Sequence, residues 1–169
     1  MSPAGQDDRR GEDLGVLLVS ASARLNRLYG RVLGQLGTSL TYRQHRLLRR
    51  VAEGHTSLAA LAALGNLTVP TVSESVEGLV RRGLLNRQVN PQNRRQMVLS
   101  VTAEGREAKE AGDAALQSVN DRLLRAVPEE HQQVLRESLA ALYDAATEVF
   151  HEPDAPTPAT AGAARLTET

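Results

Sequence analysis

The sequence predicts a mainly α-helical protein that carries one small β-hairpin. Apolar residues recur three and four positions apart through most of the chain, which is the spacing of amphipathic helices. The chain has one Phe, three Tyr and no Trp, so its core must be built from Leu, Val and Ala, and this composition favours helices over a β-sandwich. One short segment, LLNRQVNPQNRRQMVLSV at residues 84–101, instead has two strand-like runs around a polar loop.

The first long helix is expected after a polar N-terminal segment, residues 1–12, which we predict to be a disordered tail. The helix should start near Asp13 and end at Gly37, because glycine commonly terminates helices. Its apolar stripe has helical spacing and consists of Leu14, Leu17, Leu18, Ala21, Leu25, Leu28, Val32 and Leu36.

Three shorter helices are expected next, and each begins at a capping residue. Thr41 is followed by Gln44 three positions later, which is the pattern of a capping box. Pro70 is compatible with the fourth helix because it falls in the first turn. The expected N-caps are Thr41, Ser57 and Thr68, and the expected stops are Gly54, Gly65–Asn66 and Gly83. The buried stripe of the fourth helix is expected to be Val72, Val76 and Leu79.

The hairpin and two long helices complete the ordered part of the chain. In the second strand, Met97, Leu99 and Val101 alternate with Gln96, Val98 and Ser100, which is the period of a strand. Thr102 should start a fifth helix that runs to about Ala126. Pro128-Glu129-Glu130 fits the start of a sixth helix. Residues 152–169, rich in Pro, Ala and Thr, are predicted to be a disordered C-terminal tail.

This order of elements predicts a winged helix-turn-helix at residues 38–101, because a compact helical run leads directly into a hairpin tipped by two arginines. Residues 13–37 and 102–151 carry apolar stripes that no sheet in the chain would cover. We therefore expect them to be dimerisation helices that interlock in a symmetric homodimer. The alternative is a helical cap that folds back onto its own domain.

Composition excludes several classes of function. The chain has no Cys, which excludes disulfides, thiolate chemistry and Cys-containing zinc sites. No stretch approaches the roughly 20 apolar residues that span a bilayer, and the N-terminus is too polar for a signal peptide. We therefore expect a soluble cytoplasmic protein with no membrane partner. No Gly-rich phosphate loop, nucleophile elbow or metal cluster is present, so we predict no enzyme, no catalytic residues and no cofactor.

The formal net charge of zero hides an uneven distribution. Residues 41–101 carry nine Arg against three Glu, a net charge of +6, whereas residues 102–169 have six basic and thirteen acidic side chains, a net charge of −7. Because charges are screened beyond about 10 Å, the basic middle can attract a polyanion although the whole chain is neutral. An arginine-rich solvated surface is the alternative. The charge favours DNA only because it coincides with the helix–hairpin unit.

Three stretches together resemble the MarR family of bacterial transcription regulators. They are LTYRQHRLLRRVAEG in the second helix, SLAALAALGNLTVPTVSESVEGLVRRGLL in the third and fourth helices, and NPQNRRQMVLSVTAEGR in the hairpin and the start of the fifth helix. We call the third and fourth helices, together with the hairpin, the reading unit. The last stretch is similar to a family pattern D-P-x-D-R-R, a strand, then L-T-x-x-G-R. The resemblance runs from about Leu14 to Phe150. It implies a homodimeric DNA-binding regulator, a repressor acting on a pseudo-palindromic operator and released by a small-molecule ligand.

The resemblance implies that the fourth helix enters the major groove by its N-terminal half and that Arg94 reaches the minor groove. Thr68 and Thr71, at the start of the helix, could bond phosphates, although Thr68 is first of all an N-cap. Arg81 and Arg82 are expected to solvate the helix end or to contact the DNA backbone. The residues expected at DNA are Thr68, Val69, Pro70, Thr71, Ser73, Glu74, Glu77, Arg94 and Arg95.

Two departures from the family pattern bear on DNA affinity. Glu74 stands where the family commonly has an arginine, and it should repel phosphates, accept from cytosine N4 or point into solvent. Asn90 and Asn93 replace two wing aspartates that orient the wing arginine in the family, and an amide supplies no charge. These departures motivate an alternative function: a winged-helix protein-interaction module with weak or lost DNA binding.

The family often has a ligand pocket between its dimerisation helices and its reading unit. The helix assignment puts five residues near that junction: Tyr29, Tyr42, His45, Arg46 and Arg49. An aromatic ring beside an arginine suits a phenolic carboxylate or similar anionic effector. The alternative is that Tyr42 and His45 pack in the core and the arginines contact phosphate. The four histidines show no His-x-x-x-His spacing or carboxylate pairing, so we expect no metal site.

Overall fold

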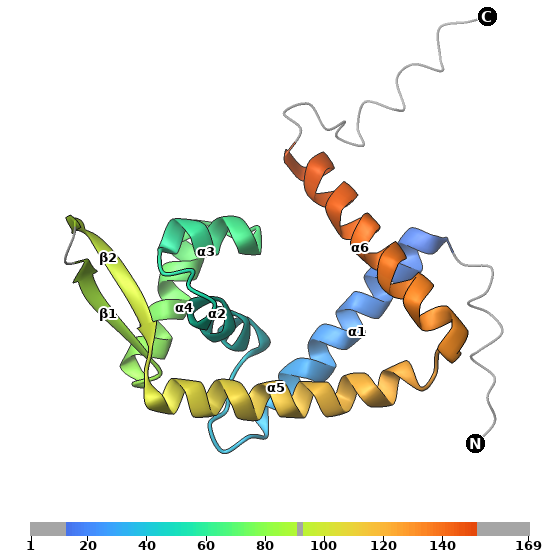
Figure 1. Ribbon diagram of the computed structural model, residues 1–169, viewed down its shortest axis with the longest axis horizontal. Coiled ribbons are helices and arrows are strands. Elements are labelled where there is room, and N and C mark those ends of the chain that lie inside the picture. Colours follow the sequence, from blue (N-terminus) through green and yellow to red (C-terminus); the bar gives the residue numbers. More distant parts are fainter. Residues whose placement is uncertain (1–12, 91–92, 152–169) are drawn as a thin grey trace, which may run out of the picture. The chain divides into compact units, whose positions relative to one another are not determined.

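The computed structural model describes residues 13–90 and 93–151, and the side chains of residues 13–89 and 97–150 among them (Figure 1). The chain separates into two compact units, one ending at Asn120 and the other starting at Asp121. The elements are α1 (Leu14–Gly34), α2 (Tyr42–Ala52), α3 (Leu58–Gly65), α4 (Val69–Arg81), β1 (Leu85–Asn90), β2 (Asn93–Val101), α5 (Ala103–Leu124) and α6 (Glu129–His151). The predicted fold class, mainly α with one hairpin, is confirmed.

The helix starts are set by the capping residues that the sequence predicts. Thr41 Oγ1 accepts from the Gln44 amide at 3.2 Å, and the Gln44 side chain accepts from the Thr41 amide at 3.0 Å, which completes the capping box of α2. Ser57 Oγ accepts from the Ala60 amide at 3.1 Å and caps α3. These bonds satisfy amides that have no partner inside the helix.

The first helix ends three residues earlier than predicted, at Gly34 instead of Gly37. The Gln35 amide donates to the Val32 carbonyl in a tight turn, and the Leu40 amide then donates back to the Leu33 carbonyl at 3.2 Å. The turn brings Leu36 and Leu40 onto the core. Burial of these two leucines, a tertiary effect, therefore decides where the helix stops.

The wing is a two-stranded antiparallel hairpin in which Leu85 faces Val101, with a register shift between Val89 and Asn90. The Leu99 amide donates to the Thr56 carbonyl at 3.1 Å, which ties β2 to the loop before α3. Leu99 is buried, whereas Met97, two positions earlier on the same face of β2, is 38% exposed. Met97 lies farther along β2 than the core extends.

The core of the first unit lies among α2, α4 and the base of the hairpin. The predicted stripe of α4 is confirmed, because Val72, Val76 and Leu79 have no exposed surface. The other fully enclosed side chains come from all the surrounding elements: Leu33, Leu40, Leu47, Leu48, Leu61, Leu85 and Leu99. This packing fixes which face of α4 remains available to a partner.

Two glycines let α5 approach the rest of the first unit. A Cβ on Gly105 would overlap the carbonyl oxygen of Leu84, and a Cβ on Gly112 would lie 2.5 Å from the His45 ring. Thr102, as predicted, starts the helix, and its hydroxyl donates to the Gly83 carbonyl at 2.7 Å. The hairpin base and α2 are therefore both held directly against α5.

The second unit contains α6, which starts at Glu129 as predicted. Its apolar residues are largely exposed, and Phe150 is 65% exposed. The exposed large apolar side chains of α6 are Val134, Leu135, Leu139, Leu142, Tyr143, Val149 and Phe150. Within residues 13–90 and 93–151, no helix combines the length and apolar character needed to cross a membrane.

Candidate nucleic-acid interface and adjoining pocket

The fourth helix is amphipathic, as a helix that inserts into a nucleic-acid groove must be, because one face packs on the protein while the other stays exposed. One face is fully buried, whereas Val69, Pro70, Glu74 and Glu77 are exposed. Ser73, also predicted to point outward, is half-buried. The hairpin follows α4 directly, so the exposed face of α4 and the wing are adjacent parts of one unit (Figure 1).

Hydroxyl groups cluster at the start of α4. Thr68 Oγ1 accepts from the Thr71 amide at 3.4 Å and lies 2.8 Å from Thr71 Oγ1, so Thr68 caps the helix as predicted. One turn on, Ser73 Oγ donates to Glu77 Oε1 at 3.2 Å. Thr68 is exposed and Thr71 half-buried, which leaves hydroxyl groups at the helix mouth available to a phosphate oxygen.

Of the two arginines at the end of α4, one is hydrogen-bonded to other parts of the protein. Arg82 Nη2 donates to the Ser39 carbonyl at 2.5 Å, and Arg82 Nη1 donates to Gln44 Oε1 at 3.4 Å. Arg82 therefore fastens the end of α4 to the start of α2. Arg81 is exposed and lines a hollow beside Gln44 and Glu74.

The wing residues that we predict to matter for DNA binding lie at the tip of the hairpin. Asn93, Arg94 and Arg95 belong to β2, and Asn90 to β1, but the side chains of all four lie outside the described residues. The prediction that Arg94 and Arg95 contact DNA therefore rests on their place at the tip of the hairpin.

All five residues predicted to surround a ligand line one pocket of about 340 Å³. Tyr29 comes from α1, and the others project from α2 at helical spacing: Tyr42, His45, Arg46 and Arg49. The remaining wall comes from α5 and was not predicted: Asp113, Leu116, Gln117 and Asn120. We call this the effector pocket, after the role that the sequence predicts for its residues.

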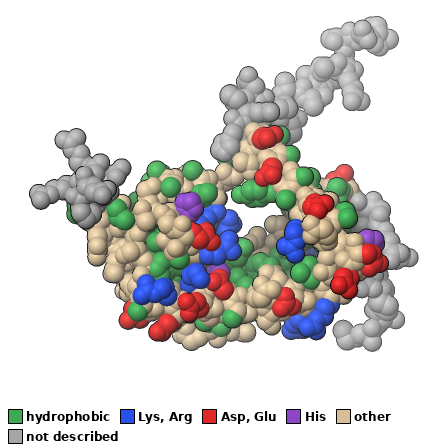
Figure 2. Space-filling model, in the orientation of Figure 1, with side chains coloured by type: hydrophobic (Ala, Val, Ile, Leu, Met, Phe, Trp, Pro, Cys, Tyr) green, Lys and Arg blue, Asp and Glu red, His purple; other side chains and the backbone are tan. Residues whose placement is uncertain are grey.

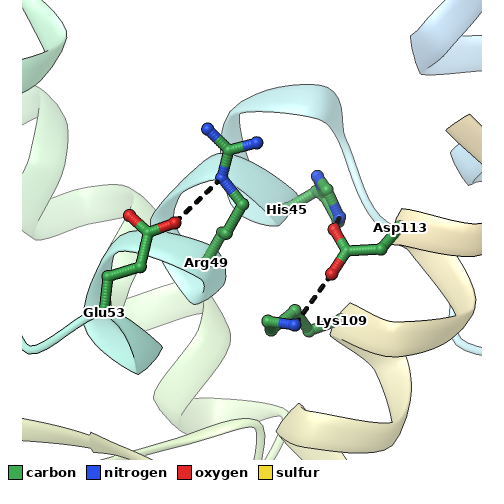
Figure 3. A network of polar contacts seen from close by, with 5 residues as sticks. All are labelled: His45, Arg49, Glu53, Lys109 and Asp113. Carbon is green, nitrogen blue, oxygen red and sulfur yellow. Dashed lines mark hydrogen bonds and ion pairs between the residues drawn. The ribbon is translucent and has the colours of Figure 1, made fainter. Parts of the chain in front are cut away.

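A polar network joins α2 to α5 at the effector pocket (Figure 3). His45 is 2% exposed, and its Nε2 lies 2.9 Å from Asp113 Oδ1. Lys109 Nζ donates to Asp113 Oδ2 at 2.7 Å. Burial tends to raise the pKa of Asp113, but Lys109 and His45 outweigh it, so the pKa of this carboxyl is lowered and it can only accept hydrogen bonds.

This network corrects the prediction that the histidines have no carboxylate partner, since Asp113 lies 68 positions after His45 in the chain. Short-range spacing could not reveal it. His45 Nδ1 is buried and has no hydrogen-bond partner in the part of the chain that the structure describes. Among these same residues, no group of three or more His, Asp or Glu side chains could hold a metal ion.

The aromatic wall of the effector pocket is formed by two tyrosines whose ring centroids lie 5.1 Å apart. The Arg46 guanidinium lies 5.8 Å from the Tyr42 ring centroid, and Tyr29 Oη bonds Asn120 Oδ1. Burial, with the neighbouring Tyr42, raises the pKa of Tyr29. Tyr29 is therefore a neutral hydrogen-bond donor at physiological pH. Arg49 Nε is paired with Glu53 Oε1 at 3.4 Å.

Comparison with known proteins identifies the helices and hairpin around α4 as a winged helix. A family described as a winged helix DNA-binding domain matches residues 40–105. A curated relative, the uncharacterized HTH-type transcriptional regulator YdcH of Bacillus subtilis, is 34% identical over 98 residues, which are 55% of this chain and 65% of the relative. The match thus spans less than two thirds of that relative's length.

Two solved structures extend the similarity to the flanking helices. A probable transcriptional regulator from Pseudomonas aeruginosa is 30% identical, with a TM-score of 0.69, and the match covers 79% of this chain and 99% of that one. A transcriptional regulator of the MarR family from Rhodococcus sp. RHA1 is 22% identical, with a TM-score of 0.67, over 83% of this chain and 97% of that one. These relatives are described as transcription regulators and not as enzymes.

Proposed function

We propose that this chain, a winged helix-turn-helix transcription regulator, is a member of the MarR family that represses transcription by binding double-stranded DNA as a homodimer. The observation that carries the proposal is the geometry of α4. Its apolar face is closed by the core, its opposite face is open, and a hairpin follows it directly. A helix of this kind fits the major groove while a wing reaches the neighbouring groove.

Each part of the reading unit has its own contact in this proposal. Thr68 and Thr71 bond phosphates at the helix mouth, and Val69, Pro70 and Ser73 lie against base edges and sugars. Glu74 and Glu77 accept from cytosine amino groups or face solvent. Arg94, flanked by Arg95, enters the minor groove, where a narrow A·T-rich groove concentrates negative potential.

The homodimer is supported by apolar side chains that are exposed on helices of each unit. On α1, Leu14, Val16 and Val19 are exposed, and Val19 is 71% exposed. On α6, no described residue is buried at all. Apolar faces of this extent are unfavourable in water and are commonly buried between subunits. A symmetric dimer would present two reading units to an operator made of two half-sites.

The effector pocket supports release by a small molecule that has an aromatic ring and an anionic group. The two tyrosines offer ring faces, and Arg46 offers a guanidinium for a carboxylate. The Tyr29 hydroxyl gives its proton to Asn120 Oδ1, so its oxygen can accept a hydrogen bond from a phenol. Because the pocket lies where α1, α2 and α5 meet, its occupation can alter the position of α2 beneath the reading unit.

The proposal is tested by selecting bound fragments from the source genome and footprinting them in the cytoplasmic salt range. Protection of two half-sites about one helical turn apart is expected, with an affinity that falls steeply as salt rises because phosphate contacts release counterions. Adding phenolic carboxylates to the same assay tests release. Absence of salt-dependent binding across the whole fragment pool would contradict the proposal.

One observation favours a second function. The open face of α4 carries two exposed carboxylates, Glu74 and Glu77, which repel a DNA backbone. A winged-helix module that binds a basic protein surface would use such a face. Capture of no DNA fragment at low salt, with the protein folded and dimeric, would favour this alternative.

A further inference from the structure

One ring nitrogen in the wall of the effector pocket has no partner. His45 lines the pocket, is 2% exposed, and has a buried Nδ1 without a hydrogen bond among the residues that the structure describes. A buried polar atom of this kind is uncommon and often marks a functional site. The edge of the ring formed by Cδ2 and Nε2 lies against α5 at Gly112, where a side chain would leave no room for it. Nδ1 lies on the other edge of the ring (Figure 3).

The partner of Nε2 decides which protons the ring can hold. Asp113 Oδ1 lies 2.9 Å from His45 Nε2, and the carboxylate of Asp113 can only accept hydrogen bonds. Nε2 therefore carries a proton whether the ring is neutral or charged. Nδ1 holds either a lone pair or a second proton, and adding that proton breaks no hydrogen bond. The ring can thus change charge while its contact with α5 stays intact.

The surroundings of the ring act on a second proton in opposite directions. The negative charge of Asp113 favours it, whereas burial of His45 opposes it. Three cations also oppose it, of which two line the pocket and the third bonds the other oxygen of Asp113: Arg46, Arg49 and Lys109. The anionic group of an effector offsets these cations, so its presence in the pocket favours the second proton.

Titratable or charged side chains face the ring and its neighbours from three helices: Tyr29 of α1, Tyr42, Arg46 and Arg49 of α2 with Glu53 at its end, and Lys109 and Asp113 of α5. Arg43 and Arg50 line a second pocket, which shares Tyr42 and Arg46 with this one. Carboxyl, tyrosine, lysine and arginine side chains ordinarily titrate outside the range from about pH 6 to about pH 8. Burial raises the pKa of Tyr29, and the pKa of Asp113 is lowered, so neither group moves into that range. Histidine is the residue type in this wall that ordinarily changes charge near neutral pH.

We propose that the effector pocket takes up a proton together with its anionic effector, and that Nδ1 of His45 receives it. The proposal rests on the effector site of the proposed function and adds a dependence on pH to it. A proton taken up on binding makes the affinity rise as the pH falls, by at most about tenfold per pH unit for one proton. A cell with a more acidic cytoplasm would then need less effector to release the DNA.

The test is calorimetric titration of the full chain with 4-hydroxybenzoate near pH 7, in PIPES and in Tris buffer. The two buffers release different heats when they give up a proton, so the difference in measured heat gives the number of protons taken up. The carboxyl and phenol groups of this probe titrate outside the range used. We expect uptake of a substantial fraction of one proton per bound ligand. The Kd should be roughly threefold to tenfold lower near pH 6 than near pH 8.

Two substitutions assign the proton. His45→Gln keeps an amide that can donate to Asp113 but cannot gain a proton, so both the proton uptake and the pH dependence of the Kd should be lost. The matched control is His131→Gln, which removes an exposed histidine of α6 and should behave as the wild type. Thermal melts check folding. Asp113→Asn, which removes the negative charge that favours the second proton, should reduce the uptake and serves if His45→Gln does not fold.

The possible outcomes separate this proposal from the proposed function. Binding of 4-hydroxybenzoate without proton uptake, and with equal Kd near pH 6 and pH 8, overturns the proposal and leaves release by an aromatic anion standing. Equal proton uptake by the wild type and a folded His45→Gln also overturns it, because another group then receives the proton. Absence of saturable binding overturns this proposal together with the effector part of the proposed function. DNA binding is decided separately by the footprinting experiment.

Discussion

Helices α2 and α4 belong to the same winged helix and carry opposite charge on their exposed sides. The middle of α4 exposes Glu74 and Glu77, and its arginines come only at the end, where Arg82 is bonded to Ser39. Helix α2 carries four arginines and no acidic residue: Arg43, Arg46, Arg49 and Arg50. Figure 2 shows Lys and Arg side chains gathered over the part of the surface where α2 lies.

A basic stretch of sequence therefore does not form one continuous basic surface. Of the nine arginines between residues 41 and 101, four lie on α2, where they line pockets or pair with Glu53. If the chain binds DNA as proposed, its grip depends on the wing arginines and on hydroxyl groups at the start of α4. In the proposed function, the charge on α2 serves an anionic effector instead.

The largest expected effect comes from the close approach of α5 to the base of the hairpin, which we compare with its approach to α2. Gly105→Ala should destabilise the fold by about 3 kcal/mol, because the new methyl group meets the Leu84 backbone, which cannot move without shifting the hairpin. Gly112→Ala should cost less, roughly 1.5 kcal/mol, because the His45 side chain can yield. Thermal and urea unfolding measure both.

The matched control is Gly34→Ala, because a Cβ at residue 34 meets nothing within 4 Å. It should leave stability unchanged or raise it by about 0.5 kcal/mol. Equal losses for Gly105→Ala and Gly34→Ala would show that the close approach of α5 to the hairpin does not hold in solution.

The second expected effect concerns the tie between α2 and α5. Asp113→Ala should destabilise the protein by about 2 kcal/mol at neutral pH, because buried His45 loses its hydrogen-bond partner. Asp113→Asn should cost less, since an amide oxygen can still accept from His45 Nε2. Unfolding free energies of the three proteins measure the difference, and identical values for Ala and Asn would contradict the role of the hydrogen bond.

The same carboxyl predicts a pH dependence. The pKa of Asp113 in the folded protein is lowered from its ordinary value of 3.8, so its stabilising contribution is complete above that value. The contribution is lost as the pH falls from about 3.8 through the lower folded pKa. The gap in stability between the wild type and Asp113→Ala should therefore narrow below pH 4, and a gap that stays constant to pH 2 would argue against this linkage.

The third expected effect separates the arginines of the wing from those of α2 in DNA binding. Arg94→Ala should lower DNA affinity roughly tenfold and reduce the salt slope by about one. Arg49→Ala, which removes a guanidinium already paired with Glu53, should leave both unchanged. Fluorescence anisotropy over a salt series measures them. Similar losses from the two variants would mean that α2 also faces the DNA backbone.

The smallest expected effect comes from removing one negative charge from the exposed face of α4. Glu74→Gln removes an exposed carboxylate and should raise DNA affinity about two- to threefold, mainly at low salt, through weaker repulsion of phosphates. A loss of affinity confined to sites with a particular cytosine would instead indicate that Glu74 reads that base.

The family resemblance implied a pocket, and helical spacing predicted which residues of α2 line it. Tyr42, His45, Arg46 and Arg49 recur three and four positions apart, so they must share a side of one helix. Asp113 could not be predicted in the same way, because it reaches His45 only through the packing of α5 against α2. Gly112, next to Asp113, gave a signal: a glycine inside a helix often marks a close approach.

The order of the elements, their capping residues and the buried stripe of α4 are encoded locally in the chain, because they follow from short-range hydrogen bonds and from apolar periodicity within one helix. Tertiary structure alone decided the early end of α1, the exposure of Met97, the pairing of His45 with Asp113, and the gathering of arginines around two pockets. These features depend on contacts between residues distant in the chain, and local patterns carry no information about which distant partner will pack against them.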